Sequence, residues 1–150
     1  MGKAEVLKKG KDAAILAIGD MAISSLKAAD ILSREGVDAE VINMRFIKPI
    51  DKNIILNTAD RIKKFVVVED NILQGGFGSS VLEVLSENQR NDIEVLRLGI
   101  PDKFIVHGKR EDLLNELGLS AEGIAGILQE RLSSTNTRAA KTFLKDNGKD

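Results

Sequence analysis

The chain has 150 residues, of which 43% are hydrophobic, and its 22 Lys and Arg nearly balance its 23 Asp and Glu. This length suits about one domain with its own core, and the balanced charge excludes the strong field expected of a protein that binds nucleic acid or an anionic membrane. The absence of Cys, Trp and Tyr excludes a disulfide framework, sulfur-ligated metal and a platform for stacking bases.

Four short apolar segments bounded by turn residues predict buried β-strands, at 13–19, 39–46, 65–70 and 93–100. Apolar and polar residues do not alternate cleanly in them, which indicates a parallel sheet covered by helices on both faces. The opening segment 4–12 predicts a further short strand at an edge of the sheet, where its lysines would discourage pairing with another molecule. The direction of that strand is left open.

Apolar residues at helical spacing predict helices between and after these strands. Gly36 and Gly118 predict the ends of two helices, and Asp51 and Ser120 are plausible N-caps. The apolar positions, helix by helix, are Ala22, Leu26, Ala29 and Leu32; Ile54, Ile55, Ala59 and Ile62; Phe77, Val81, Val84 and Leu85; Leu113, Leu114 and Leu117; and Ile124, Ile127, Leu128 and Leu132.

The alternation of strands and helices predicts an α/β fold, a three-layer α/β/α sandwich around a mostly parallel sheet of about five strands. Residues 1–132 are expected to form this domain. Residues 133–150 are polar and predict a flexible tail, with Phe143 and Leu144 as its possible anchors. No apolar run reaches the roughly 18 residues that span a membrane, and the first residues lack the apolar centre of a signal peptide, so we expect a cytoplasmic protein.

The segment 69–80, EDNILQGGFGSS, is the most unusual loop at the carboxyl ends of the predicted strands, where ligands of parallel sheets usually bind. It lacks the lysine of a P-loop and carries only the first half of a dinucleotide-binding fingerprint. Its glycines could allow a tight turn and close packing, or its backbone N–H groups could receive an anion. The candidate residues for an interdomain interface or a weak anion site are Glu69, Asp70, Ile72, Leu73, Gly75, Gly76, Phe77, Gly78 and Ser79.

Sets of residues that could carry catalysis or hold a metal are incomplete. His107 is the only histidine, no serine lies in a G-x-S-x-G motif, and Glu69 and Asp70, as neighbours on a strand, should point to opposite faces. We therefore assign no catalytic, cofactor-binding or metal-binding residue, and we expect His107 to lie in an exposed loop.

Three segments resemble a known family. VVVEDNILQGGFGSSVLEVL at 66–85, NMRFIKPID at 43–51 and VLRLGIPDKFIVHGKREDLLNELGLSAEGI at 95–124 are similar to the C-terminal domain of the 1-deoxy-D-xylulose-5-phosphate synthases, which belong to the transketolase family. The resemblance covers residues 2 to about 132.

The resemblance implies that this chain is a fragment, the third domain of a three-domain enzyme and a structural or interface module without the active site. The full enzymes are homodimeric transferases that use thiamine diphosphate and magnesium, bound between the first two domains. They join pyruvate and glyceraldehyde 3-phosphate with loss of CO2, for isoprene and thiamine biosynthesis. The upstream domains of the same enzyme are the implied partner, and the fragment alone is expected to be inactive.

Two alternatives stay open at this stage. One is the C-terminal domain of a 2-oxoacid dehydrogenase β subunit or of a transketolase, which would dock a partner, although GIPDKFIVHG argues against it. The other is an anion-binding regulatory module built on Gly75 to Ser79. The chain also departs from the family at Lys109, where relatives often place Ser or Thr as a helix cap.

Overall fold

The computed structural model describes residues 1–103 and 107–146, and from residue 134 onward it describes the backbone alone. Residues 104–106, which belong to the GIPDKFIVHG motif, and 147–150 lie outside the described residues. The elements are β1 (Glu5–Lys8), β2 (Ala13–Ala17), α1 (Met21–Arg34), β3 (Ala39–Asn43), α2 (Lys52–Arg61), β4 (Lys64–Ile72), α3 (Phe77–Glu87), β5 (Glu94–Ile100), α4 (Arg110–Glu116) and α5 (Ala121–Asp146).

The strands form one sheet in the order β1-β3-β2-β4-β5. Strands β2 to β5 are parallel, whereas β1 pairs with β3 in the antiparallel direction, with Glu5 opposite Asn43. This confirms the predicted mostly parallel sheet and gives the edge strand the direction that the sequence left open. The parallel strands all end at one side of the sheet, where the loops that follow β2, β3, β4 and β5 lie. We call this side the carboxyl-end edge.

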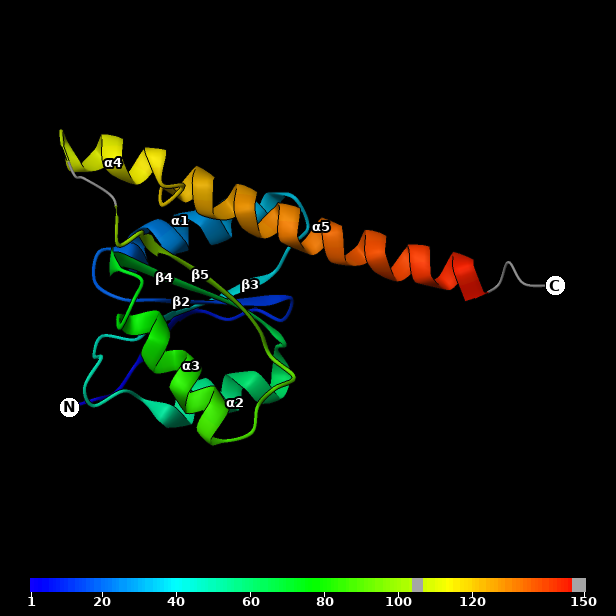
Figure 1. Ribbon diagram of the computed structural model, residues 1–150, viewed down its shortest axis with the longest axis horizontal. Helices are drawn as coiled ribbons and strands as arrows, with labels where there is room; N and C mark the ends of the chain where they lie inside the picture. Colours follow the sequence, from blue (N-terminus) through cyan, green and yellow to red (C-terminus); the bar gives the residue numbers. More distant parts are fainter. Residues whose placement is uncertain (104–106, 147–150) are drawn as a thin grey trace.

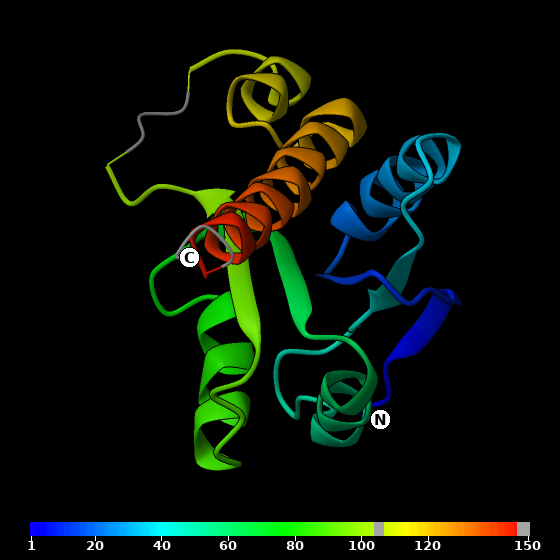
Figure 2. The same ribbon diagram turned by 90° about the vertical axis from the view of Figure 1, so that its right-hand side faces the viewer.

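Helices cover both faces of the sheet, as predicted. Figure 1 shows α1, α4 and α5 on one side of the sheet and α2 and α3 on the other. In the turned view of Figure 2, α1 and α5 again lie side by side. The layers explain why β2 is buried at every position, because a central parallel strand has no solvent-facing side.

Two apolar cores fill the space between the layers. One contains Ile15, Val41 and Val66 beneath α1 and α5, and the other contains Leu16, Ile42 and Val67 against α2 and α3. Neighbouring residues of each strand thus supply opposite cores, as the two-residue period of a strand requires.

Asp51 is the predicted N-cap of α2, and the structure confirms it. One carboxylate oxygen accepts from the backbone N–H of Ile54 at 3.3 Å, and the other accepts from the N–H of Ala4 at 3.0 Å. The same buried side chain therefore starts a helix and holds the segment that leads into β1.

The C-terminal segment is helical. α5 runs from Ala121 to Asp146, past the residue 132 at which the domain was expected to end, and Phe143 and Leu144, the possible anchors, lie among the residues whose side chains are not described. Figure 1 shows its last turns projecting beyond the sheet on the side opposite the carboxyl-end edge. The flexibility of this segment and its separation from the domain stay predictions.

Candidate functional site

The glycine-rich turn before α3 encloses a buried carboxylate. Glu69, at 1% exposure, accepts hydrogen bonds from the backbone N–H groups of Phe77 at 2.7 Å and Gly78 at 3.0 Å. These N–H groups belong to the first turn of α3, where helical backbone donors have no partner within the helix and the helix dipole favours a negative charge. Glu69 is thus the anion of this site, supplied by the chain itself.

Close packing explains the glycines. A methyl group on Gly76 would come within 2.4 Å of Glu69 Oε2, and one on Gly78 within 2.7 Å of Arg97 Nε. Gly75 has a φ of +69°, a conformation that other residues adopt at a cost. The interpretation of the glycines as a device for close backbone approach therefore agrees with the geometry.

Arg97 on β5 locks the same turn from the neighbouring strand. Its Nη2 donates to the Leu73 carbonyl and to the Ser79 hydroxyl at 3.0 Å, and that hydroxyl also lies 3.3 Å from the Leu73 carbonyl. Sequence reasoning missed Arg97, although a lone arginine inside the apolar segment EVLRLGI was a visible signal.

The backbone N–H groups that an anion-binding site would use are already occupied in this arrangement. The N–H groups of Phe77 and Gly78, which an added phosphate would need, already donate to Glu69. The Ser79 hydroxyl is held by Arg97 and Leu73. The geometry does not favour an anion site at Gly75 to Ser79.

The candidate interface residues separate into two groups. Phe77 is fully buried in the core against α2 and α3, so its proposed place at an interface is wrong: it is a core residue. Leu73 is half-buried, and its side chain packs against the backbone of Gly99, which has no side chain of its own. Ile72 is 48% exposed at the end of β4 and keeps its place as a candidate.

Asp70 points away from Glu69 and forms an ion pair. Arg110, the first residue of α4, bridges Asp70 and Asp20, the latter at 3.0 Å. One guanidinium therefore joins the loops that follow β2 and β4. This contact places Asp70 at the carboxyl-end edge, in an ion pair with Arg110.

A second buried acid, which sequence reasoning missed, lies at the opposite edge. Glu40 on β3 is 1% exposed, accepts from the Gly10 N–H at 3.3 Å and pairs with both terminal nitrogens of Arg61 at 2.9 and 3.3 Å. Its hydrogen bonds raise the pKa of Arg61. An acid inside the strand AEVIN was the available signal, and its role is to join β3 to α2.

Exposed charges also link α2 to the start of β5. Arg90 pairs with Asp92 at 3.2 Å and with Asp60 at 2.7 Å, and Lys63 pairs with Asp92 at 2.7 Å. Hydrogen bonds from Arg90 and then from Lys63 hold the pKa of Asp92 well below its usual range.

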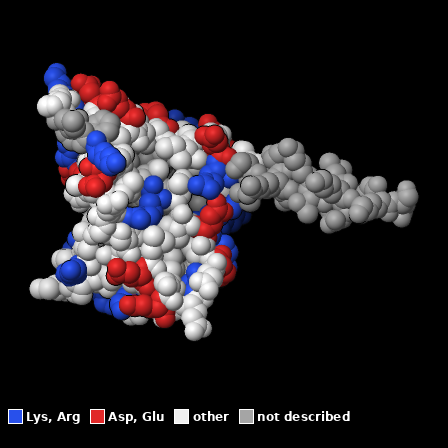
Figure 3. Space-filling model, viewed as in Figure 1, with Lys and Arg blue, Asp and Glu red and all other residues white. Residues whose placement is uncertain are grey.

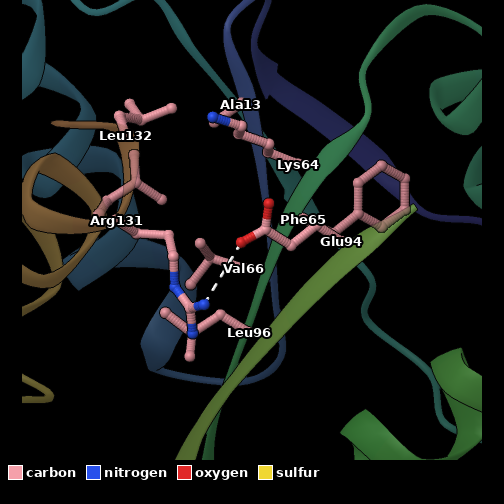
Figure 4. Close-up of a pocket in the computed structure, with 9 residues that line it drawn as sticks. Ala13, Lys64, Phe65, Val66, Glu94, Leu96, Arg131 and Leu132 are labelled. Atoms are coloured by element: carbon pink, nitrogen blue, oxygen red, sulfur yellow. Dashed lines mark hydrogen bonds and ion pairs between the residues drawn. The ribbon is translucent and has the colours of Figure 1, made fainter. Parts of the chain in front are cut away.

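A small pocket lies between β4, β5 and α5, beside the Glu94–Arg131 ion pair at 3.3 Å (Figure 4). Its apolar walls include Phe65, Leu96 and Leu128, and it holds a volume of about 10 Å³ for a water-sized sphere. Such a space barely admits one water molecule, so it offers no ligand site.

His107 is exposed, as expected. Lys109 precedes α4 in an extended conformation and makes no side-chain cap. Within residues 1–103 and 107–133, His, Asp and Glu nowhere gather in a group of three that could hold a metal ion, and no described helix is long and apolar enough to cross a membrane.

Known proteins resemble this chain in sequence and in structure. The family model of the transketolase C-terminal domain matches residues 2–124. The 1-deoxy-D-xylulose-5-phosphate synthase 1 of Geobacter metallireducens is 44% identical over 97% of this chain and 21% of its own length. The 1-deoxy-D-xylulose-5-phosphate synthase of Gloeobacter violaceus is 47% identical over 94% of this chain and 22% of its own length.

A solved structure described as a split-gene transketolase, an inactive β4 tetramer, matches with a TM-score of 0.80 and 37% identity, over 88% of this chain and 43% of that one. The present chain thus spans about a fifth of the length of the curated relatives that it matches. The matching sheet, its helices and the family model over residues 2–124 agree. The chain belongs to the transketolase C-terminal domain family.

Proposed function

We propose that this chain serves as the third, C-terminal domain of a 1-deoxy-D-xylulose-5-phosphate synthase. One observation carries the proposal: relatives with that name match nearly the whole chain at 44 to 47% identity, while the chain spans only about a fifth of their length. The domain is then a structural and interface module of a larger, cytoplasmic, homodimeric enzyme.

The proposed parent enzyme joins pyruvate to glyceraldehyde 3-phosphate with loss of CO2, with thiamine diphosphate and magnesium bound between its first two domains. The side chains described here do not fit that cofactor. They form no acidic or histidine group for the metal, and the N–H groups of α3 that could receive a diphosphate donate to Glu69. We therefore derive no chemical step through this domain.

Its own residues instead shape a stable surface for the upstream domains. Glu69 and Arg97 fix the turn that carries Leu73, and Ile72 is presented beside it. Of the candidate interface, Glu69, Phe77 and Gly78 are buried within the domain, and the residues that remain are Asp70, Ile72, Leu73, Gly75, Gly76 and Ser79.

The activity of the isolated chain tests the proposal. Incubated with pyruvate, glyceraldehyde 3-phosphate, thiamine diphosphate and magnesium, the 150-residue chain is expected to form no product. The description of the solved split-gene transketolase as inactive supports this expectation. Turnover above a protein-free blank would contradict the proposal.

A chimera provides the positive arm of the test. The matching C-terminal fifth of the Geobacter metallireducens enzyme is replaced by this chain, and product formation is compared with that of the unaltered enzyme and of a version truncated before the domain. We expect the chimera to be active and the truncated version to be inactive. A chimera no better than the truncated version would count against the proposed function.

A further inference from the structure

Large apolar side chains are rarely exposed in the described part of the chain. Those that are exposed include two isoleucines at the carboxyl-end edge: Ile23, in the first turn of α1, is 62% exposed, and Ile72, at the end of β4, is 48% exposed. Leu82 on α3, at 38%, lies elsewhere on the surface, and Val6, at 40%, lies near the start of β1, where the chain enters the domain. Single exposed residues need no explanation, but two at one edge invite one.

Ion pairs place the two isoleucines on neighbouring segments. Arg110 binds Asp20, three residues before Ile23, and Asp70, two residues before Ile72. Both carboxylates are held by one guanidinium, so the start of α1 and the end of β4 lie within the reach of one side chain. We call Ile23 and Ile72 with Asp20, Asp70 and Arg110 the Ile23–Ile72 patch.

The chain enters the domain at the same edge. Because β1 is antiparallel to β3, its first residue, Glu5, lies opposite Asn43, the last residue of β3. The N–H of Ala4 is held there by Asp51. Figure 1 shows the N-terminus on the side where the parallel strands end, while the end of α5 projects on the other side.

The relatives show how much polypeptide lies beyond this domain. The chain covers 21 to 22% of their length, and the family is a C-terminal domain, so most of a relative precedes the segment matched here. In such a relative, the preceding polypeptide would arrive at the position that corresponds to Ala4, at the carboxyl-end edge.

We propose that the Ile23–Ile72 patch is the surface against which the preceding domain of the same polypeptide packs. This inference rests on the proposed function and specifies its interface. The occupant is an apolar surface with acceptors or acids at its rim, which would cover both isoleucines and bind the remaining N–H groups of Arg110.

The open edge of β5 is the competing surface. Figure 3 shows that uncharged side chains make up much of the face that includes α3 and β5, with some charged side chains among them, and β5 is half-exposed beyond Glu94. Leu82 on α3 is exposed, so a loss of its accessibility would show that a partner covers that face. Chain entry favours the Ile23–Ile72 patch, because Ala4 and both isoleucines lie at the carboxyl-end edge, whereas the edge of β5 runs along the whole length of the sheet.

Thiol accessibility tests the proposal, because the chain contains no Cys. Three variants, Ile23→Cys, Ile72→Cys and Leu82→Cys, are made in the isolated chain and in the chimera, and the labelling rate of each introduced thiol is read by peptide mass spectrometry. We expect Ile23→Cys and Ile72→Cys to react at least about tenfold more slowly in the chimera than in the isolated chain. Leu82→Cys serves as the exposed control and should react equally in both.

The outcomes separate the two proposals. An active chimera with unchanged rates at 23 and 72 would overturn the patch but keep the proposed function, and slowing at 82 alone would assign the interface to the α3–β5 face. Protection that appears in the isolated chain as its concentration rises would identify a second copy as the occupant and overturn the proposal. Protection without product would support the patch and count against the proposed activity.

Discussion

At the scale of single residues, Glu69 organises the site. Its carboxylate is buried, accepts two backbone hydrogen bonds and lies close to Arg97 around Gly78. A buried acid is tolerated only where hydrogen bonds and positive potential replace its hydration. Here the first turn of α3 supplies both.

Glu69→Gln is expected to destabilise the domain by about 1 to 3 kcal/mol, because an amide offers one acceptor where the two N–H groups need two. The measurement is the urea-unfolding free energy. Glu83→Gln, on the exposed side of α3, is the control and should have little effect. Equal stability of the Glu69→Gln variant and the parent chain would show that the carboxylate does not hold the turn.

Ser25, unlike Glu69, is a buried polar residue whose side chain makes no hydrogen bond with the described residues. Its hydroxyl is fully buried on α1. Ser25→Ala removes an unpaired polar group, so we expect a change from zero to a gain of about 1 kcal/mol. Ser24→Ala, on the same helix, measures the gain in helix propensity alone. A clear loss of stability in Ser25→Ala relative to Ser24→Ala would reveal a hydrogen bond of Ser25 in solution.

At the scale of elements, helix termini decide local stability. α2 is capped by Asp51, whereas α4 begins after Lys109, whose side chain cannot accept a hydrogen bond. Lys109→Ser should stabilise the start of α4 by about 0.5 to 2 kcal/mol and raise the melting temperature. Lys109→Ala, which removes the charge without adding an acceptor, is the control. A Lys109→Ser variant that melts at or below the temperature of the parent chain would contradict this expectation.

The contact between α2 and the start of β5 should make stability depend on pH. Arg90 and Lys63 lower the pKa of Asp92 in the folded state, so the unfolded chain binds this proton more readily. The stabilisation is therefore complete above the ordinary pKa near 3.8 and is lost as the pH falls below it.

In Asp92→Asn, the difference in unfolding free energy between pH 7 and pH 3 should be smaller than in the parent chain, and the gap in stability between the two proteins should narrow towards pH 3. Urea midpoints measured across this range provide the comparison. Asp30→Asn on α1, across the sheet, controls for the loss of any one negative charge. An equal slope in Asp92→Asn would mean that these ion pairs do not form in solution.

At the scale of the whole molecule, the sequence predicts the layers better than the contacts. Periodicity gave the strands, the helices and the parallel sheet, because burial on both faces leaves continuous apolar runs such as FVVV. Helical spacing of apolar residues predicted that Phe77 lies in the core with Val81 and Val84. Phe77 was considered an interface residue only because of the glycines beside it.

The long-range pairings between side chains could not be predicted from the sequence. Glu69 meets α3 only after the intervening turn folds back, and Glu40 meets Arg61 across 21 residues. Such contacts depend on how elements pack, which no local pattern encodes. The length of α5 was not predicted for another reason, since apolar periodicity marks only those helical positions that pack against a core.

The carboxylate of Glu69 also has a consequence for regulation. It is tethered eight residues from the amide of Phe77, so its effective concentration at the glycine-rich turn is fixed by chain geometry and is high. A soluble phosphate would have to displace the Glu69 carboxylate, which is covalently attached to the same chain. The glycine-rich turn is therefore expected to bind added phosphate weakly, because Glu69 already occupies its donors.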